Sequence, residues 1–194
     1  MKSFILASGS PRRKELLQQA RYTFSIQTSD LDEIFEPHLT PSEVVCELAR
    51  QKAEAVAKTN QDAVVLGSDT IVVCNDQILG KPKDQNEARE MLQRLSDRDH
   101  SVLTGVAIYE KGETITFFEE TVVHFYPLTS EEIEQYLQTG EPFDKAGSYG
   151  IQGFGAYLVQ SISGDYNNVV GLPLAKTMRE LQAFHIYPTI QVRD

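Results

Sequence analysis

Three consecutive basic residues, Arg12, Arg13 and Lys14, follow a short polar turn in the stretch "ILASGSPRRKELL". Ser10 suits a helix N-cap and Pro11 suits the first helical position, so the basic residues fall in the first turn of an expected helix. Helix N-termini carry unpaired N–H groups and a partial positive charge, which disfavour cations there. A bound anion, most simply a phosphate, would explain the arrangement. The alternative is a solvated basic surface balanced by the acidic residue that follows.

Asp69 is the most conspicuous carboxylate, because it lies inside the apolar stretch "AVVLGSDTIVV". A buried carboxylate costs several kcal/mol unless a cation, a metal or a cluster of hydrogen-bond donors pairs with it. The alternative is a local Asx-turn at a bulge marked by Gly67. Glu33, after a short expected strand, is a candidate second carboxylate, but spacing alone makes Asp30 and Asp32 equally plausible.

Lysines complete the set of charged candidates. Lys52 falls within the apolar stripe of an expected helix, which most often means a side chain that reaches water and sometimes one directed into a site. Lys81 and Lys83 flank Pro82, which keeps the segment extended and directs the two amines to opposite sides. Separated cations and carboxylates of this kind suit a metal-assisted reaction on a polyphosphate. The candidate cations are Arg12, Arg13, Lys52 and Lys81, and the candidate carboxylates are Glu33 and Asp69.

Composition limits the class of protein. The chain has 194 residues, 41% of them apolar, which is enough for one well-buried core or two small lobes around a cleft. With 18 basic against 28 acidic residues, the formal net charge of −10 disfavours a polymeric nucleic acid as partner. Cys46 and Cys74 form no disulfide framework or metal-ligand motif and are interpreted as reduced core thiols. The four histidines have no zinc-site spacing and are interpreted as structural or exposed. Without a signal peptide or a membrane-spanning stretch, we expect a cytoplasmic protein.

The elements that must position these residues alternate between strands and helices. Expected helices begin at Pro11, Pro41, Asp84, Thr129 or Ser130, and Pro173. Expected strands are Phe4 to Ala7, "YTFSIQ", "AVVLGSDTIVV" with an interruption at residues 67–70, "QIL", "SVLTGVAIYE", "TITFFEETVVHF", and Ala156 to Ser163. The pattern predicts a mixed α/β architecture with a cleft lined by loops.

Seven motifs cover the chain from end to end: "LASGSPRRKELL", "ELARQKAEAV", "GSDTIV", "LGKPKD", "SVLTGVAI", "DKAGSYGIQGFGAYLV" and "GDYNNVVGLPL". In order and spacing they resemble the Maf family, nucleoside triphosphate pyrophosphatases once described as septum formation inhibitors. The resemblance implies a single Maf-like domain over residues 1–194, with the tail after about residue 185 peripheral. It also implies an elongated mixed β-sheet flanked by helices, two lobes around a cleft, as in Ham1 and inosine triphosphatase-like proteins. Homodimers are frequent in the family.

The resemblance further implies hydrolysis of the bond between the α- and β-phosphates. The family's proton acceptor corresponds to Asp69, helped by a divalent cation, Mg²⁺ or Mn²⁺, that Glu33 also contacts. The family's phosphate-binding positions correspond to Ser8, Arg13, Lys52 and Lys81. At the three positions that distinguish subfamilies the chain has Arg12, Thr70 and Gln152, the set of the dTTP/UTP branch. A glutamine amide offers a donor and an acceptor, which complement a uracil or thymine edge.

Two other functions are compatible with parts of this pattern. A nucleotidyltransferase would also place a basic residue after a strand and turn, although it would require more glycine in the turn. A regulatory protein of septum formation that binds nucleotide without turnover would not need a buried carboxylate beside phosphates. Whether the substrates are unmodified dTTP and UTP or modified pyrimidine nucleotides is left open.

Overall fold

The computed structural model describes residues 2–29 and 34–190. The chain folds as two compact units. Unit 1 consists of Met1–Asp69, Thr104–Phe118 and Gly171–Asp194, and unit 2 consists of Thr70–Leu103 and Glu119–Val170. Both units combine helices with strands, as predicted, whereas the expectation of a single domain over residues 1–194 stays a prediction.

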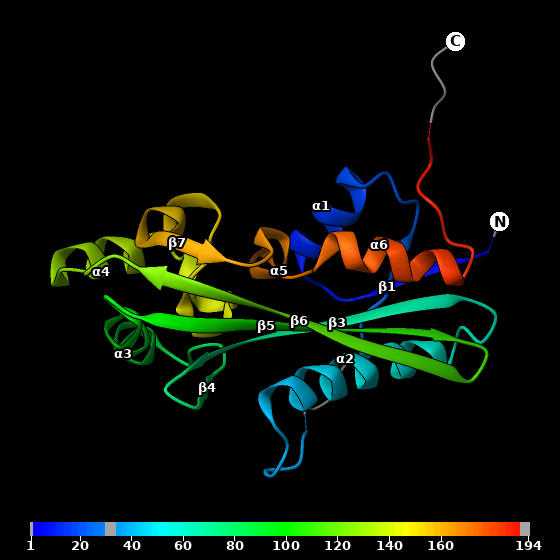
Figure 1. Ribbon diagram of the computed structural model, residues 1–194, viewed down its shortest axis with the longest axis horizontal. Coiled ribbons are helices and arrows are strands. Elements are labelled where there is room, and N and C mark those ends of the chain that lie inside the picture. The colour runs from blue at the N-terminus through cyan, green and yellow to red at the C-terminus, as the bar shows by residue number, and fades with distance from the viewer. Residues whose placement is uncertain (1, 30–33, 191–194) are drawn as a thin grey trace. The chain divides into compact units, whose positions relative to one another are not determined.

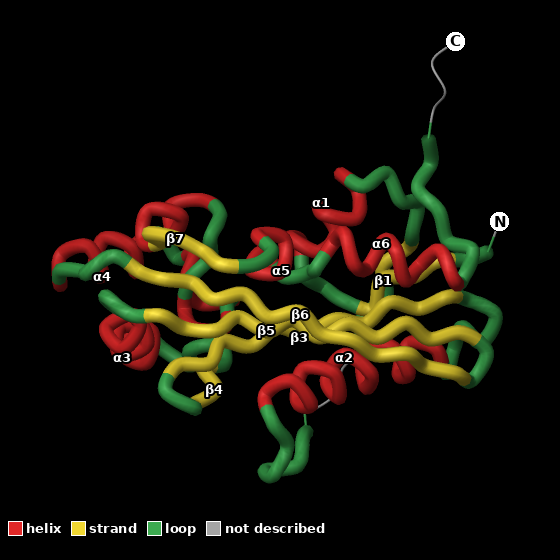
Figure 2. The backbone as a smooth tube through the Cα atoms, in the orientation of Figure 1, coloured by secondary structure: helices red, strands yellow, loops and turns green. Residues whose placement is uncertain are grey.

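Within the described residues, seven strands join in one mixed sheet, in the order β2-β1-β3-β5-β6-β7 with β4 paired to β3 (Figure 2). The strands are β1 (Phe4–Ala7), β2 (Ser25–Ile26), β3 (Val64–Cys74), β4 (Gln77–Leu79), β5 (Asp99–Glu110), β6 (Glu113–Phe125) and β7 (Val159–Ser163). β1 is parallel to β2 and β3, whereas β4 is antiparallel to β3 and β7 is antiparallel to β6. The predicted mixed sheet is therefore confirmed.

The α-helices are α1 (Pro11–Gln19), α2 (Pro41–Ala57), α3 (Gln85–Leu95), α4 (Ser130–Gln138), α5 (Tyr166–Val170) and α6 (Leu174–Ala183). Short 3₁₀-helices are η1 (Glu141–Asp144), η2 (Ala146–Ser148) and η3 (Gly153–Leu158). Ser10 caps α1 by accepting a hydrogen bond from the Arg13 backbone N–H, and Pro11 is its first residue, as the sequence predicts. The strand expected from Ala156 is wrong at its start, because residues up to Leu158 belong to η3.

In unit 1, α2 covers one face of the sheet, and α1 and α6 lie on the other (Figure 1). All four residues of β1 are buried, as is typical of a strand with helices on both faces. Alternate residues of β1 pack with α2 and with neighbouring residues on and next to β3 and β5 in one cluster. The cluster contains Ile5, Ala7, Ala49, Ala53, Val56, Ala57, Ala63, Val65 and Ala107.

Gly67 lets α2 lie directly against β3. A Cβ atom at this position would come within 2.2 Å of the Ala49 carbonyl oxygen and 2.8 Å of the Ala53 backbone nitrogen, both in α2. A Cβ atom at Gly105 on β5 would likewise come within 2.2 Å of the Val45 carbonyl oxygen in α2. Glycine on two neighbouring strands therefore allows the helix backbone to approach the sheet.

Gly67→Ala is expected to lower the free energy of unfolding by about 3 kcal/mol, because the added methyl group must displace the backbone of α2. Urea denaturation of the purified variant measures this loss. Gly80→Ala is the matched control, since a Cβ atom there has nothing within 4 Å and should change stability by less than about 0.5 kcal/mol. Equal stabilities of the two variants would contradict the role assigned to Gly67.

Unit 2 has its own hydrophobic core. Its buried members are Val72, Cys74, Leu79, Ala88, Met91, Leu92, Leu95, Val102, Val123, Phe125, Ile133, Tyr136, Leu137, Tyr149 and Leu158. His100 lies beside this core, only 3% exposed, and shares a hydrogen bond of 2.7 Å between its Nε2 and the Tyr149 hydroxyl. The ring of Phe125 packs edge-on against both rings. His100 is therefore structural, as the sequence indicates.

Burial lowers the pKa of His100 from 6.5 to about 4. Between these values the unfolded chain binds more protons than the folded one, so the stability that His100 contributes above pH 6.5 is lost as the pH falls to 4. The loss amounts to about 3 kcal/mol. Urea denaturation at several pH values should therefore show a flatter pH dependence for His100→Gln than for wild type. His38→Gln, at an exposed histidine, should keep the wild-type slope. Parallel curves for all three proteins would contradict this.

Candidate active site

Ser8 and Arg13 form a buried pair at the carboxyl end of β1. The Arg13 guanidinium donates from Nη1 to the Ser8 hydroxyl at 3.0 Å and from Nε to the Gly171 carbonyl at 2.8 Å. Ser8 and Arg13 are only 7% and 9% exposed. The contact with Ser8 follows from the local sequence, because the turn after β1 and the first turn of α1 bring the two side chains to the same end of the strand.

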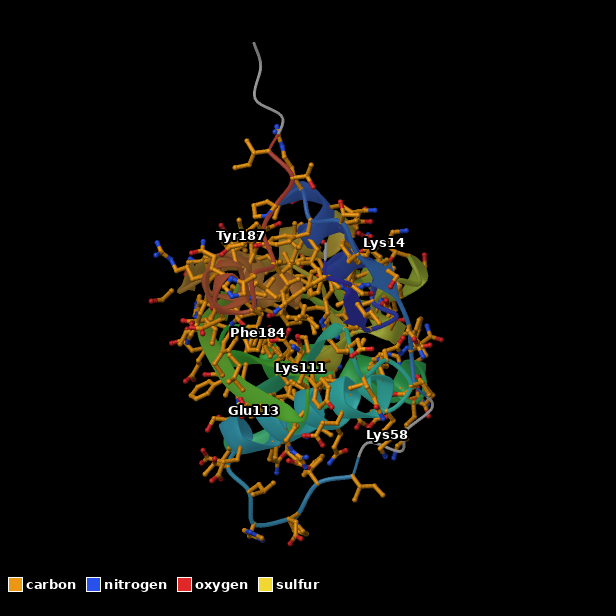
Figure 3. All side chains as sticks on the ribbon, turned by 90° about the vertical axis from the view of Figure 1, so that its right-hand side faces the viewer. Lys14, Lys58, Lys111, Glu113, Phe184 and Tyr187 are labelled. Atoms are coloured by element: carbon orange, nitrogen blue, oxygen red, sulfur yellow. The ribbon has the colours of Figure 1, made fainter. Side chains whose placement is uncertain are left out.

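The three consecutive basic residues of α1 differ in their exposure to solvent. Lys14 is exposed, as Figure 3 shows, Arg12 is half-buried, and Arg13 is buried. A solvated basic surface therefore describes Lys14 and does not describe Arg13. The buried guanidinium at a strand end supports the anion-binding interpretation, since arginine presents its donors in a fixed planar fork.

Asp69 lies on β3 and is 8% exposed. The expected interruption at residues 67–70 is absent, because β3 runs without a break through them, and so an Asx-turn at a bulge does not account for Asp69. Its Oδ1 forms an ion pair with Lys52 Nζ, which supplies the positive partner that a buried carboxylate needs. Lys52 interrupts the apolar stripe of α2 because its side chain is directed to this carboxylate.

Both pairs lie where β1 ends and β3 continues. Ala7, the last residue of β1, is in register with Gly67 of β3, so Ser8 follows the strand end beside Ser68 and Asp69. Ser68 and Asp69 are consecutive on a strand and therefore face opposite sides of the sheet. Ser68 donates to the same Gly171 carbonyl as Arg13, at 3.5 Å, whereas Asp69 faces α2. This edge of unit 1 thus offers donors on one side and a carboxylate with an ammonium on the other.

The remaining candidates belong to unit 2. Thr70 follows Asp69 on β3 and is half-buried. Lys81 is exposed directly after Gly80, whose carbonyl accepts a hydrogen bond of 3.0 Å from Gly147 N. Gln152 is half-buried at the residue that precedes η3. No helix in the described ranges is long and apolar enough to cross a membrane.

A model of the Maf-like protein family matches residues 3–184 of the chain. The chain belongs to the Maf-like family. Two curated relatives of this Maf-like protein are named dTTP/UTP pyrophosphatase. The one from Halalkalibacterium halodurans is 60% identical over 182 residues, which cover 94% of this chain and 96% of the relative. The one from Bacillus cytotoxicus is 56% identical over 184 residues, with 95% and 96% covered. The family predicted from the motifs is confirmed.

Solved Ham1 proteins are similar to this Maf-like protein at a greater distance. The protein from Coxiella burnetii has a TM-score of 0.48 and 18% identity, with 82% of this chain and 81% of that chain covered. The Staphylococcus aureus protein has a TM-score of 0.46 and 17% identity, with 81% and 80% covered. Because these TM-scores are low, the family assignment rests on the family model and on the sequence relatives.

A divalent cation is compatible with the part of the set that the structure describes. Asp69 offers a buried carboxylate, whereas Glu33, like Asp30 and Asp32, lies outside the described residues. Within residues 2–29 and 34–190, no group of three or more His, Cys, Asp or Glu side chains could hold a metal. Mg²⁺ does not require such a group, since one or two carboxylates and substrate phosphates usually hold it.

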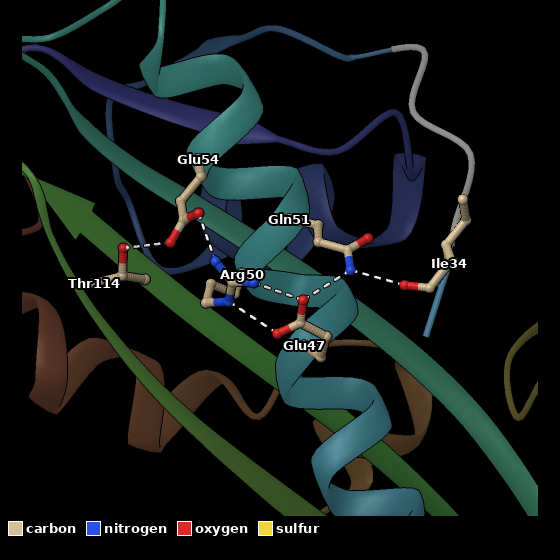
Figure 4. A network of polar contacts seen from close by, with 6 residues as sticks. All are labelled: Ile34, Glu47, Arg50, Gln51, Glu54 and Thr114. Atoms are coloured by element: carbon tan, nitrogen blue, oxygen red, sulfur yellow. Dashed lines mark hydrogen bonds and ion pairs between the residues drawn. The ribbon is translucent and has the colours of Figure 1, made fainter. Parts of the chain in front are cut away.

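The chain directly after residue 33 lies beside α2. Gln51 Nε2 donates to the Ile34 carbonyl at 2.8 Å (Figure 4). Gln51 also donates to Glu47, which binds Arg50, and Arg50 binds Glu54 in turn. This network holds Ile34 next to the helical turn that carries Lys52.

Two contributors to the Arg13 environment could not be identified from the sequence. Ser68 is fully buried and contacts the carbonyl of Gly171, and Gly171 is 158 residues from Arg13 in the chain. A backbone carbonyl leaves no signature in the side-chain sequence. The sequence marks this position only by the glycine at residue 171. Its φ of 132° is a conformation that residues with a side chain rarely adopt.

Proposed function

We propose that this Maf-like protein hydrolyses dTTP and UTP to the nucleoside monophosphate and pyrophosphate. The name carried by relatives at 55–60% identity supports the reaction. The observation that carries the proposal is the pair formed by buried Asp69 and half-buried Lys52, at the strand end where Arg13 and Ser8 also lie. A carboxylate held beside cations suits the activation of water near phosphates.

In the proposed reaction, Asp69 accepts a proton from water while the water oxygen bonds to the α-phosphorus. The bond from that phosphorus to the bridging oxygen breaks, and pyrophosphate leaves with the bond's electrons. Lys52, Arg13 and Ser8 bind phosphate oxygens, and we assign the same role to Lys81. Positive charge and fixed donors at these oxygens stabilise the charge that develops on the leaving group.

We further propose that Asp69 and Glu33 hold a divalent cation, Mg²⁺ or Mn²⁺. When bound, such a cation neutralises phosphate charge and polarises phosphate oxygens. Arg12, Thr70 and Gln152 are proposed to select the base, with the Gln152 amide donating to one uracil position and accepting from its neighbour. A homodimer and a cytoplasmic location complete the proposal, and sedimentation analysis of the purified protein tests the first.

A panel of nucleoside triphosphates tests the proposed function. The protein is incubated with dTTP, UTP, CTP, 5-methyl-UTP, pseudouridine triphosphate and 7-methyl-GTP in Mg²⁺ or Mn²⁺, and monophosphate and pyrophosphate are quantified. We expect equal amounts of both products from the thymine and uracil nucleotides. Binding of UTP without turnover would favour a regulatory protein of septum formation. A large increase in pyrophosphate release on adding a sugar phosphate would favour a nucleotidyltransferase.

A further inference from the structure

We propose that Glu141 is a positioning residue that fixes Gln152 for base selection, an inference that rests on the proposed function. Its carboxylate binds the backbone N–H groups of the second and third residues after Gln152. Oε1 accepts a hydrogen bond from Phe154 N at 3.1 Å, and Oε2 accepts one from Gly155 N at 3.2 Å. Both residues and Gln152 belong to unit 2, so the contact lies within one compact unit.

Glu141 acts as the N-terminal cap of η3. The first N–H groups of a helix have no partner within the helix and usually bind the side chain of the N-cap residue. Gln152 is the N-cap residue of η3, yet its side chain makes no capping hydrogen bond. Because Glu141 satisfies these N–H groups from outside the helix, the Gln152 amide is not needed for capping.

Gly153 allows the carboxylate to approach. Its φ is 65°, and a Cβ atom there would lie 2.7 Å from Glu141 Oε1. Residue 153 therefore requires glycine for two reasons. Its backbone is left-handed, and a side chain would occupy the space of the Glu141 carboxylate.

The Glu141 backbone and the chain before Gln152 are also held. Glu141 N donates to the Thr139 hydroxyl at 3.1 Å, and the Glu141 carbonyl accepts from Lys145 Nζ. On the other side of Gln152, Gly150 N donates to the Tyr136 hydroxyl at 3.1 Å. Gln152 is thus carried by a segment that is fixed two residues before it and two residues after it.

Such fixation matters because a glutamine amide can complement either uracil or cytosine. Uracil presents an acceptor and a donor where cytosine presents a donor and an acceptor, so rotating the amide by 180° matches the wrong base. Discrimination therefore requires that the amide be held in one position and orientation. A shift of the backbone at Gln152 should reduce this discrimination more than it reduces turnover.

The test compares kcat/KM for UTP and CTP in Glu141→Gln. The new amide keeps one acceptor oxygen but places its NH₂ group against a backbone N–H. We expect the ratio of kcat/KM for UTP to that for CTP to fall about tenfold. Inhibition by inorganic pyrophosphate, which has no base, should stay unchanged. Glu131→Gln is the control, because Glu131 is an exposed residue on α4 in the same unit.

A double variant separates positioning from a general structural effect. In a Gln152→Ala background the base-selecting amide is absent, so adding Glu141→Gln should leave the ratio unchanged. Glu141→Asp keeps the charge on a side chain one methylene shorter, and its ratio should lie between those of wild type and Glu141→Gln. If one of these three variants fails to fold, the other two still test the proposal.

Several results would overturn the role of Glu141. They are an equal loss of kcat/KM for both nucleotides, an unchanged ratio in Glu141→Asp and Glu141→Gln, or a further fall of the ratio in the double variant. Failure of the proposed function has a different signature. In that case the wild-type protein itself either releases no pyrophosphate or does not prefer UTP.

Discussion

Asp69→Asn is expected to lower kcat for UTP hydrolysis about a thousandfold, the effect of losing a general base. The substitution keeps the shape of the side chain and an oxygen that can accept from Lys52, so the pair on β3 and α2 retains its geometry. It also removes one negative charge beside the phosphates. We therefore expect UTP binding to be largely retained.

Pyrophosphate release gives kcat, and isothermal titration of the inactive variant with UTP gives Kd. Asp62→Asn is the matched control, since Asp62 is exposed on unit 1 and should retain wild-type kcat. A kcat near that of wild type in Asp69→Asn would remove Asp69 from the role of proton acceptor. Loss of UTP binding together with kcat would instead make Asp69 a residue that holds substrate.

Local signals in the sequence predicted most of unit 1 that bears on chemistry. Ser10 and Pro11 mark the start of α1, and the apolar spacing of α2 marks its buried face. Lys52 and Asp69 are conspicuous in the sequence because each breaks the apolar pattern of its own element. Their pairing joins residues 17 positions apart on a helix and a strand, and it depends on how these two elements pack, which local sequence does not indicate.

The features that the sequence did not predict depend on packing between distant segments of the chain. Residues 67–70 are small and polar, which is typical of a turn, but Gly67 is small because α2 presses against it, and β3 continues. Glu141 gave no signal in the sequence, because its partners are backbone N–H groups 13 and 14 residues away. Contacts to backbone atoms depend on the path of the chain and not on the identity of the partner.

Arg13→Lys is the second substitution with a large expected effect: a kcat/KM for UTP about a hundredfold lower, mainly through KM. The guanidinium uses Nη1 for Ser8 and Nε for the Gly171 carbonyl, and this fork orients its remaining donors. A lysine has a single nitrogen, which cannot reproduce these contacts and also bind a phosphate in the same geometry. Steady-state kinetics with UTP measures the change.

Arg179→Lys tests whether the effect is specific, because Arg179 is exposed on α6 in the same unit and should keep the wild-type KM. The positive charge at residue 13 is retained in the lysine variant, so general electrostatic attraction for the nucleotide is also retained. A large rise in KM would therefore be caused by the lost geometry of the fork. An unchanged KM would mean that charge alone suffices at the start of α1, and the buried contacts of Arg13 would then be structural.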